Sequence, residues 1–401
     1  MKVNRVEQQI ITKNHPIWCY INQMCYKAKN LYNYANYLIR QEFTENKSYI
    51  KYYDMNSSLK NVAEYKACMS QPANCVLRRL DKIWKSFFVA IKDWKRNPHK
   101  YKGMPKLPKY LNKNGRFVWE VPNNTCYLDG NELHFRIRKL QDIKWKTKAK
   151  GRLLQVRFVP RGCDYVMEIV TEIEINPPTK ENDNIIGIDL GINNFVTITN
   201  NIGKQPIIIN GKGLKSINQY FNKKRATIMS ETIRRNNQYW SLKLSRLTNK
   251  RFNKVKNFMH HASRLIVDYC LENDISKVIC GLNSFWKQEA NLGHQNNQNF
   301  IFIPYNMFIK QLKYKCEEVG IKFMTTDESY TSGTSFLDDE EPIKENYNKS
   351  RRIKRGLFRT NDGRLINSDV NGSLQIIKKV FPNAFADGIQ GCLTPSIINV
   401  I

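Results

Sequence analysis

Residues 185–199, Ile-Ile-Gly-Ile-Asp-Leu-Gly-Ile-Asn-Asn-Phe-Val-Thr-Ile-Thr, are the most informative stretch of this chain. An apolar run carries one carboxylate, Asp189, to its end, Gly191 and two asparagines follow, and a second β-rich run begins at Phe195. The pattern predicts a hairpin of two buried strands with an acid on the first. A buried carboxylate is stable only when it is protonated or when a cation neutralises it. Glycine at 187 and 191 would let a backbone or a phosphate approach closely. An aspartate that caps a turn explains the local sequence equally well.

The charge of the chain points to a polyanionic partner. Its 401 residues include 65 Lys and Arg against 35 Asp and Glu, for a formal net charge of +30, and 41% are hydrophobic. Such a balance disfavours a compact state unless a polyanion is bound. Twenty Tyr, nineteen Phe and seven Trp are interleaved with the basic residues, as stacking on nucleic-acid bases would favour. A membrane partner is disfavoured, because the sequence has no long apolar run that spans a bilayer and no strongly amphipathic basic helix that stands alone.

The cysteines indicate a reducing compartment. There are ten of them, none in a Cys-x-x-Cys pair, and several lie within apolar patterns. The first ten residues lack the apolar core of a signal peptide. We therefore expect a cytoplasmic protein, and its length suggests two or three domains.

Hydrophobic periodicity divides the chain into an N-terminal helical and β part and a C-terminal α/β part. The N-terminal part should contain a strand at 2–12, a helix at 16–42, a helix that begins near Ser70 as its N-cap, and antiparallel strands at 116–175 that the first strand could join. A polar boundary at 176–183 follows. The C-terminal part should contain strands at 185–190, 195–200, 206–209, 277–280 and 321–325, and helices at 214–272, at 305–318 and from Asp369 onward, where Ser368 could be the cap.

One helical stretch carries a concentrated basic zone. Its members are Lys243, Arg246, Lys250, Arg251, Lys254 and Lys256. Without further context, a solvated charged face is the simpler interpretation of this zone.

Three acids fall at the edges of apolar segments in the C-terminal part: Asp189, Glu328 and Asp369. Converging carboxylates provide the hard oxygen ligands that Mg²⁺ prefers beside a phosphodiester. Two such ions could activate the attacking water and stabilise the leaving oxygen. The order strand, strand, strand, helix, strand, helix, with acids at these points, is typical of an RNase H-like domain.

Several motifs together resemble the TnpB family of transposon-encoded, RNA-guided RuvC-type DNA endonucleases, which are related to compact type V CRISPR effectors. The matching segments of the C-terminal half are Gly187-Ile-Asp-Leu-Gly-Ile-Asn-Asn, Trp286-Lys-Gln-Glu-Ala-Asn-Leu-Gly, Asn296-Asn-Gln-Asn-Phe, Glu328-Ser-Tyr-Thr-Ser, Arg352-Ile-Lys-Arg-Gly-Leu-Phe and Asn367-Ser-Asp-Val-Asn-Gly-Ser. The N-terminal half matches in Ala28-Lys-Asn-Leu-Tyr-Asn-Tyr-Ala-Asn-Tyr-Leu-Ile-Arg and Lys106-Leu-Pro-Lys-Tyr. Each motif alone would be weak, but the set covers nearly the whole chain.

The resemblance implies a multidomain α+β fold. An RNase H-like (RuvC) nuclease domain at 184–401 would follow a β-barrel, wedge-like domain at 1–14 and 100–183. A helical recognition domain at 15–99 would be inserted into that barrel domain. The implied activity is RNA-guided, Mg²⁺-dependent cleavage of double-stranded DNA beside a short adjacent motif, in a prokaryotic host where the protein is nucleoid-associated when bound to DNA. The catalytic and metal-binding residues would be Asp189, Glu328 and Asp369, with two ions, and Lys287, Arg351, Arg352, Lys354 and Arg355 would contact nucleic acid.

The chain departs from the family pattern at two places. Many relatives place the second acid at the end of the strand that here reads Val278-Ile-Cys-Gly, but the nearest acid is Glu289, six residues beyond Asn283. Glu328 fits an alternative arrangement in which the next strand supplies this acid. Relatives often hold a structural Zn²⁺ with paired cysteines in the insert, but residues 329–368 contain neither Cys nor His, so we expect no structural zinc there.

Three other functions fit parts of the sequence. They are a nuclease-inactive RNA-guided DNA-binding repressor, a compact type V CRISPR effector, and a guide-independent RNase H-like transposase or resolvase. The three retained acids argue against the repressor, and the large basic, aromatic N-terminal half argues against the guide-independent enzyme. The sequence leaves open the guide RNA, the adjacent motif, the cleavage positions, the oligomeric state, and whether the locus is a transposon or a CRISPR array.

Overall fold

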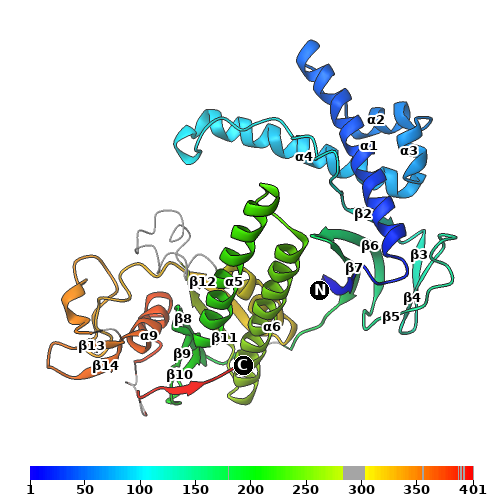
Figure 1. The fold of residues 1–401 in the computed structure, drawn as a ribbon. Coiled ribbons are helices and arrows are strands. Elements are labelled where there is room, and N and C mark those ends of the chain that lie inside the picture. The colour runs from blue at the N-terminus through cyan, green and yellow to red at the C-terminus, as the bar shows by residue number, and fades with distance from the viewer. Residues whose placement is uncertain are drawn as a thin grey trace. The chain divides into compact units, whose positions relative to one another are not determined.

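The computed structural model describes residues 1–178, 180–282, 303–354, 356–386, 388, 391 and 393–400. The chain forms two compact units, Met1–Ile175 and Asn176–Ile401 (Figure 1). In the described part of the chain, no helix is both long enough and apolar enough to cross a membrane.

Unit 1 contains two small antiparallel sheets that share a core. The first has the order β1-β7-β6-β2, with strands β1 (Lys2–Ile11), β7 (Asp164–Glu174), β6 (Arg152–Arg161) and β2 (Trp119–Pro122). The second has the order β3-β4-β5, with strands β3 (Cys126–Asp129), β4 (Glu132–Phe135) and β5 (Trp145–Lys146). The first strand does join the sheet, because β1 pairs with β7 along its whole length. Alternate residues of these strands, such as Val156 and Phe158 on β6, enter one apolar cluster.

The helices of unit 1 pack around a second apolar cluster that includes Trp84. They are α1 (Trp18–Glu45), α2 (Tyr52–Leu59), α3 (Ala63–Ala67) and α4 (Ser70–Arg96), and a short 3-10 turn, η1 (Pro98–Lys100), follows. The expected cap of α4 was wrong, because Ser70 is the first helical residue and Met69 is the N-cap. Met69 has a positive φ of 63° and provides no side-chain cap, so packing rather than capping fixes this end.

Unit 2 is built on a six-stranded sheet of order β12-β11-β8-β9-β10-β15. The strands are β8 (Ile185–Leu190), β9 (Asn194–Asn200), β10 (Ile207–Asn210), β11 (Lys277–Gly281), β12 (Lys322–Thr326) and β15 (Ser396–Ile398). β8, β11 and β12 are parallel, whereas β9 is antiparallel to both of its neighbours. The strands predicted from the sequence match this sheet except at β15, whose three residues are too short for a periodic signal.

The two faces of this sheet carry different helices. Ile186, Ile188 and Leu190 of β8 enter the large cluster formed with α6 (Leu242–Glu272) and α8 (Tyr305–Glu318). Ile185 enters a smaller cluster with α9 (Ser368–Val380). Because side chains alternate along a strand, Asp189 lies on the face that α9 covers.

The predicted helix at 214–272 is in fact a hairpin of α5 (Lys212–Asn236) and α6, which lie side by side (Figure 1). Asn237 adopts the left-handed conformation that ends α5, with φ 49°. Ser241 then caps α6 by accepting a hydrogen bond from the backbone N–H of Leu244. The apolar stripe that predicted a helix begins only at Phe252, so it gave no indication of this break.

The insert between β12 and α9 forms a small folded unit of its own. It contains the 3-10 turn η2 (Lys349–Arg351) and the hairpin of β13 (Leu357–Arg359) and β14 (Leu365–Asn367). Phe336 and Phe358 form its apolar cluster with residues of α9. Arg351 and Glu340 form an ion pair at 2.6 Å, with both side chains 16% exposed.

Candidate active site

Asp189 is brought to its position by close packing of α9 on β8. A Cβ on Gly187 would lie 2.4 Å from the backbone oxygen of Ser373, so only glycine permits this approach. The Ser373 hydroxyl donates to the backbone oxygen of Gly187 at 2.9 Å and fixes the helix on the strand. One residue earlier on α9, Gly372 leaves room for the carboxylate, since a Cβ there would lie 3.3 Å from Asp189 Oδ2. The glycine at 187 therefore admits a backbone, one of the two possibilities that the sequence suggested.

Asp369 lies in the first turn of α9, close to Asp189. The cap of this helix is Asn367, not Ser368 as expected, because the Asn367 side chain accepts from the backbone N–H groups of Asp369 and Val370. The helix therefore begins at Ser368, and Asp369 projects from its positively polarised end.

Two polar neighbours hold the Asp369 carboxylate. The Asn194 side chain, at the start of β9, donates to Oδ2 at 2.7 Å. Arg352, from the insert, lies 3.8 Å from Oδ1. Arg352 also donates to the Ser368 hydroxyl at 3.3 Å.

Glu328 reaches the same edge of the sheet from β12. It lies two residues beyond the end of that strand, and β12 pairs with β11 so that Thr326 is opposite Gly281. A Cβ on Gly281 would lie 3.2 Å from Glu328 Oε2. The carboxylate of Glu328 therefore occupies space that a side chain on the neighbouring strand would otherwise fill.

Glu328 Oε2 is a buried acceptor without a hydrogen-bond partner in the described part of the chain. Its environment raises the pKa of Glu328 from 4.5 to about 7, chiefly because burial disfavours the charged form and also because Asp327 is near, while Lys379 opposes the shift. Lys379 itself donates to the backbone oxygen of Ser329 at 3.0 Å. An unsatisfied buried carboxylate oxygen is what a cation, or a proton, would stabilise.

Electrostatic coupling joins the three acids. The pKa of Asp189 is raised well above its ordinary value, first by burial and then by the negative charges of Asp369 and Glu328, with Arg352 opposing. Tyr305, at the start of α8, donates to the backbone oxygen of Gly191 at 2.8 Å. Its pKa is raised by burial and then by Asp189 and Glu328. Such mutual perturbation of titratable groups is characteristic of functional sites.

The site fits Mg²⁺ held in part by water. Among the described residues, no three His, Cys, Asp or Glu side chains are grouped closely enough to ligate one ion together. Mg²⁺ commonly uses one or two carboxylates and keeps several waters. The unpartnered Oε2 and the raised pKa values of Asp189 and Glu328 are consistent with such a donor set.

The residues expected to contact nucleic acid lie in different surroundings. Arg352 is beside Asp369, and Lys354 is exposed on the insert. Arg351 is engaged with Glu340 and also donates to Asn361, so its guanidinium is held within the insert. Lys287 and Arg355 lie outside the described residues, as does Glu289.

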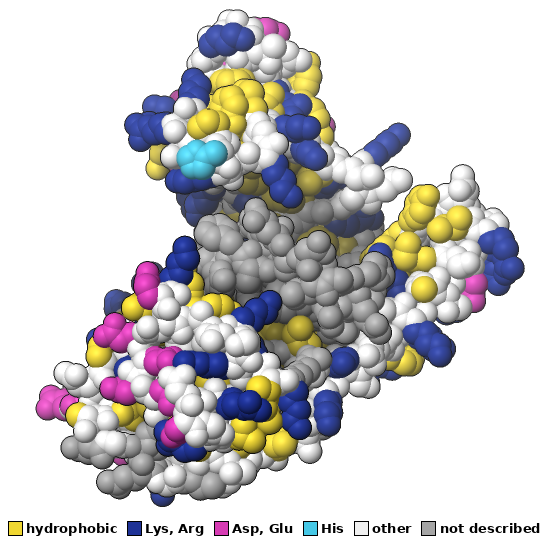
Figure 2. Space-filling view, turned by 90° about the vertical axis from the view of Figure 1, so that its left-hand side faces the viewer, with side chains coloured by type: hydrophobic (Ala, Val, Ile, Leu, Met, Phe, Trp, Pro, Cys, Tyr) yellow, Lys and Arg dark blue, Asp and Glu magenta, His cyan; other side chains and the backbone are white. Residues whose placement is uncertain are grey.

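The acids of the insert were overlooked in the sequence. The insert contains a run of four acids at 338–341, and two more, Glu345 and Asp362, lie among its basic residues. Lys and Arg side chains are widely spread over the face shown in Figure 2, while Asp and Glu side chains are concentrated in its lower part. The insert is therefore less basic than its arginines alone suggested.

Sequence reasoning missed two residues of the site. Asn194 is part of the quoted Gly-Ile-Asn-Asn turn, but nothing in its type indicated a bond to Asp369. Tyr305 begins a helix predicted only for its apolar spacing, and no local signal indicated that it would lie near the acids.

Comparison with known proteins agrees with the family suggested by the motifs. The family model OrfB_IS605, described as a probable transposase, matches residues 168–285. The model of the Cas12f1-like TNB domain matches residues 305–376. A TnpB-like protein, ORF457 of Acidianus two-tailed virus, is 25% identical over 404 residues, which cover 88% of this chain and 81% of that protein. The chain is therefore similar to a TnpB-like protein over most of its length.

Solved structures of CRISPR effectors are also similar to this chain. The mini-RNA-guided endonuclease CRISPR-Cas_phi3 aligns with a TM-score of 0.49 and 11% identity over 98% of this chain and 94% of that one. The Cas12f1-sgRNA-target DNA complex aligns with a TM-score of 0.38 and 15% identity over 93% of this chain and 98% of that one.

Proposed function

We propose that this protein is an RNA-guided DNA endonuclease, associated with a transposon, that hydrolyses phosphodiester bonds with Mg²⁺. The observation that carries the proposal is that Asp189 lies near enough to Asp369 and Glu328 for their charges to raise its pKa, while Glu328 Oε2 is buried without a hydrogen-bond partner among the described residues. The β10-β9-β8-β11-β12 order, with β9 antiparallel, supports an RNase H-like (RuvC) assignment for 184–401.

The partners follow from the family and the charge. A guide RNA and a double-stranded DNA target with a short adjacent motif suit a chain of net charge +30 that is related to TnpB. Among the structurally similar proteins, Cas12f1 forms a complex with an sgRNA and target DNA, and CasPhi-2 binds a crRNA and phosphorothioate-DNA. We assign the sheets of unit 1 to a wedge-like domain (1–14 and 100–183) and its helices to a recognition domain (15–99).

In the proposed reaction, the residues of the site would have different roles. Asp189, Glu328 and Asp369 would hold the ions, which when bound would lower the pKa of an attacking water and neutralise the leaving oxygen. Asn194 keeps the Asp369 carboxylate in one orientation through its hydrogen bond. Arg352, 38% exposed beside that carboxylate, can pair with a phosphate oxygen of the substrate.

The experiment begins with purification of the chain from cells that express it with its native flanking DNA. RNA that copurifies is sequenced, and a plasmid library with the matching target and randomised flanks is incubated with the complex and Mg²⁺. Guided double-strand cleavage that is lost in Asp189→Ala supports the proposal. Guided binding without cleavage in any divalent metal would instead establish the repressor, and cleavage that needs no RNA would establish a guide-independent nuclease.

A further inference from the structure

A groove between α5 and α6 has the composition of a nucleotide-binding site. Its cavity of about 280 Å³ is lined by residues of both helices, among them Ile217, Tyr220, Leu247, Lys250 and Lys254. None of the three acids described above lines it. We propose that this groove binds one unpaired nucleotide of a nucleic-acid strand, an inference that rests on the proposed function for the strand's presence.

The spacing of the groove residues explains how two helices make one site. On α5, Ile217 and Tyr220 are three residues apart, and on α6, Leu247, Lys250 and Lys254 follow at intervals of three and four. Residues at these intervals share one face of a helix. The two faces meet because α5 and α6 pack against each other along the hairpin.

The apolar part of the groove can stack a base. Tyr220 is 57% exposed, although its neighbour Phe221 is buried. Arg251 lies over the Phe221 ring, 5.1 Å from its centroid, and donates to Asn218 at 2.8 Å, so this wall is fixed in place. An exposed ring beside a rigid wall is a ready stacking platform, and every base has a face that can stack on it. The volume is near the lower end of the roughly 300–1,000 Å³ of ligand pockets, which suits a single base.

The charged part of the groove suits the phosphate. Lys250 and Lys254 are exposed, and in the described part of the chain neither forms an ion pair with a carboxylate. The acids of segment 212–272 are Glu231, Asp268 and Glu272. Glu231 is paired with Lys243 at 3.6 Å and Asp268 with Arg264 at 2.6 Å. The positive charge of the two lysines is therefore left for a ligand.

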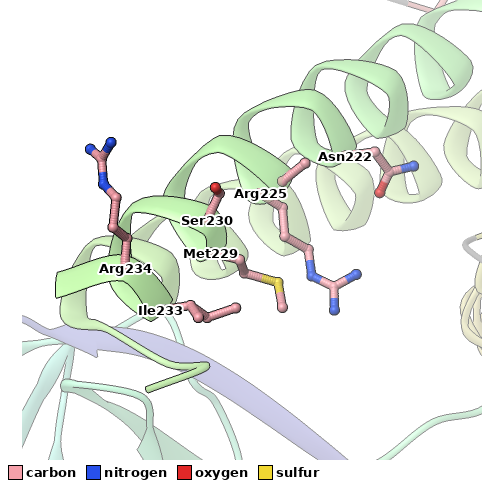
Figure 3. A pocket seen from close by; sticks show the side chains of 7 residues that line it. Asn222, Arg225, Met229, Ser230, Ile233 and Arg234 are labelled. Atoms are coloured by element: carbon pink, nitrogen blue, oxygen red, sulfur yellow. The ribbon is translucent and has the colours of Figure 1, made fainter. Parts of the chain in front are cut away.

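A larger cavity on α5 provides a contrast. It measures about 650 Å³ and is lined by residues that include Arg225, Met229 and Arg234 (Figure 3). By the helical repeat, most of its residues lie on the side of α5 opposite to Tyr220. In Figure 3, Arg225 and Met229 point to one side of the helix and Arg234 to the other, and none of the described residues that line the cavity is aromatic. Without a ring on which a base could stack, this cavity is not expected to bind a nucleotide. Substitution of its arginines therefore provides a control for the general effect of losing positive charge.

The test is photocrosslinking of the full-length protein in EDTA. The probes are a single-stranded DNA with 5-iododeoxyuridine and an RNA of the same sequence with 5-iodouridine, and crosslinked peptides are mapped by mass spectrometry. We expect a crosslink at Tyr220 that persists in Tyr220→Phe, disappears in Tyr220→Leu, and falls severalfold in Lys250→Ala/Lys254→Ala. The DNA and RNA probes show which strand the groove prefers. Arg225→Ala/Arg234→Ala removes the same charge outside the groove and should keep the wild-type yield.

Binding of the same probes is measured by fluorescence polarisation at several salt concentrations. We expect Tyr220→Leu to weaken binding about tenfold, the ordinary effect of losing one stacked base. The lysine double variant should lower the salt slope by about two units. No crosslink from 216–221 or 247–254 in the wild type, or an equal loss in both double variants, would overturn the inference. EDTA prevents cleavage, so crosslinking and cleavage are measured separately. Guided cleavage without a crosslink would refute nucleotide binding in the groove but not the nuclease activity. A crosslink without any cleavage would refute the nuclease activity but not nucleotide binding in the groove.

Discussion

Replacement of Glu328 by glutamine should abolish cleavage and at the same time stabilise the metal-free fold. Glutamine keeps the size of the side chain, but it cannot ionise or neutralise an ion. In the metal-free protein, the charged carboxylate is unfavourable because Oε2 is buried without a partner. The same substitution therefore removes a source of instability and a ligand.

The magnitude follows from the pKa of Glu328, which is about 7 in the folded protein against 4.5 ordinarily. Below pH 4.5 the carboxyl is protonated in both states, and it does not affect the pH dependence. As the pH rises toward 7, the unfolded chain ionises first, so the free energy of unfolding falls. At about 1.36 kcal/mol per unit, the loss is at most about 3 kcal/mol and is complete above pH 7. We expect Glu328→Gln to be about 1–3 kcal/mol more stable than the wild type at pH 8 in EDTA, and equally stable at pH 4.

The assay must report on unit 2 alone, because the two units can unfold separately. Hydrogen exchange with mass spectrometry meets this need, since peptides that cover β8 and α9 report the opening of the site. Mg²⁺ should slow exchange in the wild type and have little effect on Glu328→Gln. Glu181→Gln, an exposed glutamate of the same unit, is the matched control and should resemble the wild type.

Cleavage of guided DNA is measured on the same preparations. Glu328→Gln should lose orders of magnitude in rate, whereas Glu289→Gln should keep most of it. Equal protection of wild type and Glu328→Gln at pH 8 in EDTA would refute the account of the buried carboxylate. Loss of cleavage in Glu289→Gln but not in Glu328→Gln would move the second acid to position 289.

Three further substitutions test the surroundings of the acids. Gly281→Ala places a Cβ 2.6 Å from Ile376 Cδ1 and crowds the carboxylate of Glu328, so it should destabilise unit 2 by about 1–2 kcal/mol in thermal unfolding and slow cleavage. Asn194→Ala removes the hydrogen bond to the carboxylate of α9 and should lower the cleavage rate with little change in guided DNA binding. Glu340→Gln breaks the largely buried pair with Arg351 and should destabilise the insert by about 1–3 kcal/mol, seen as faster hydrogen exchange across β13.

The sheet of unit 2 could be predicted from sequence because its strands are short apolar runs with polar ends. Asp189 and Asp369 could be predicted as site residues for the same reason, since each stands where an apolar pattern begins or ends. Their proximity could not be predicted, because it depends on Gly187 and Gly372 admitting α9 to the strand. A glycine in a pattern indicates a close approach but does not identify what approaches.

Local sequence was least informative where long-range partners decide the outcome. Arg351 was predicted as a nucleic-acid contact, a prediction that stays untested, while in the structure Glu340 engages its guanidinium. The stretch 214–272 was predicted as one long helical segment from a stripe that begins only at Phe252, so the break at the left-handed Asn237 was missed. The fold of the insert, which lacks Cys and His, rests on ion pairs and a few phenylalanines that have no repeating pattern.

The position of α9 gives Asp189 and Asp369 different electrostatic surroundings. Asp369 stands in the first turn of this helix, where the unpaired backbone N–H groups and the helix dipole favour negative charge, and Asn194 donates to it. Among the described residues, Asp189 receives a backbone hydrogen bond from Leu190, and α9 covers it. The pKa of Asp189 is therefore strongly raised, and a cation that enters the site should displace a proton from Asp189. Any change that shifts α9 along β8 would therefore alter this charge balance together with the geometry of the site.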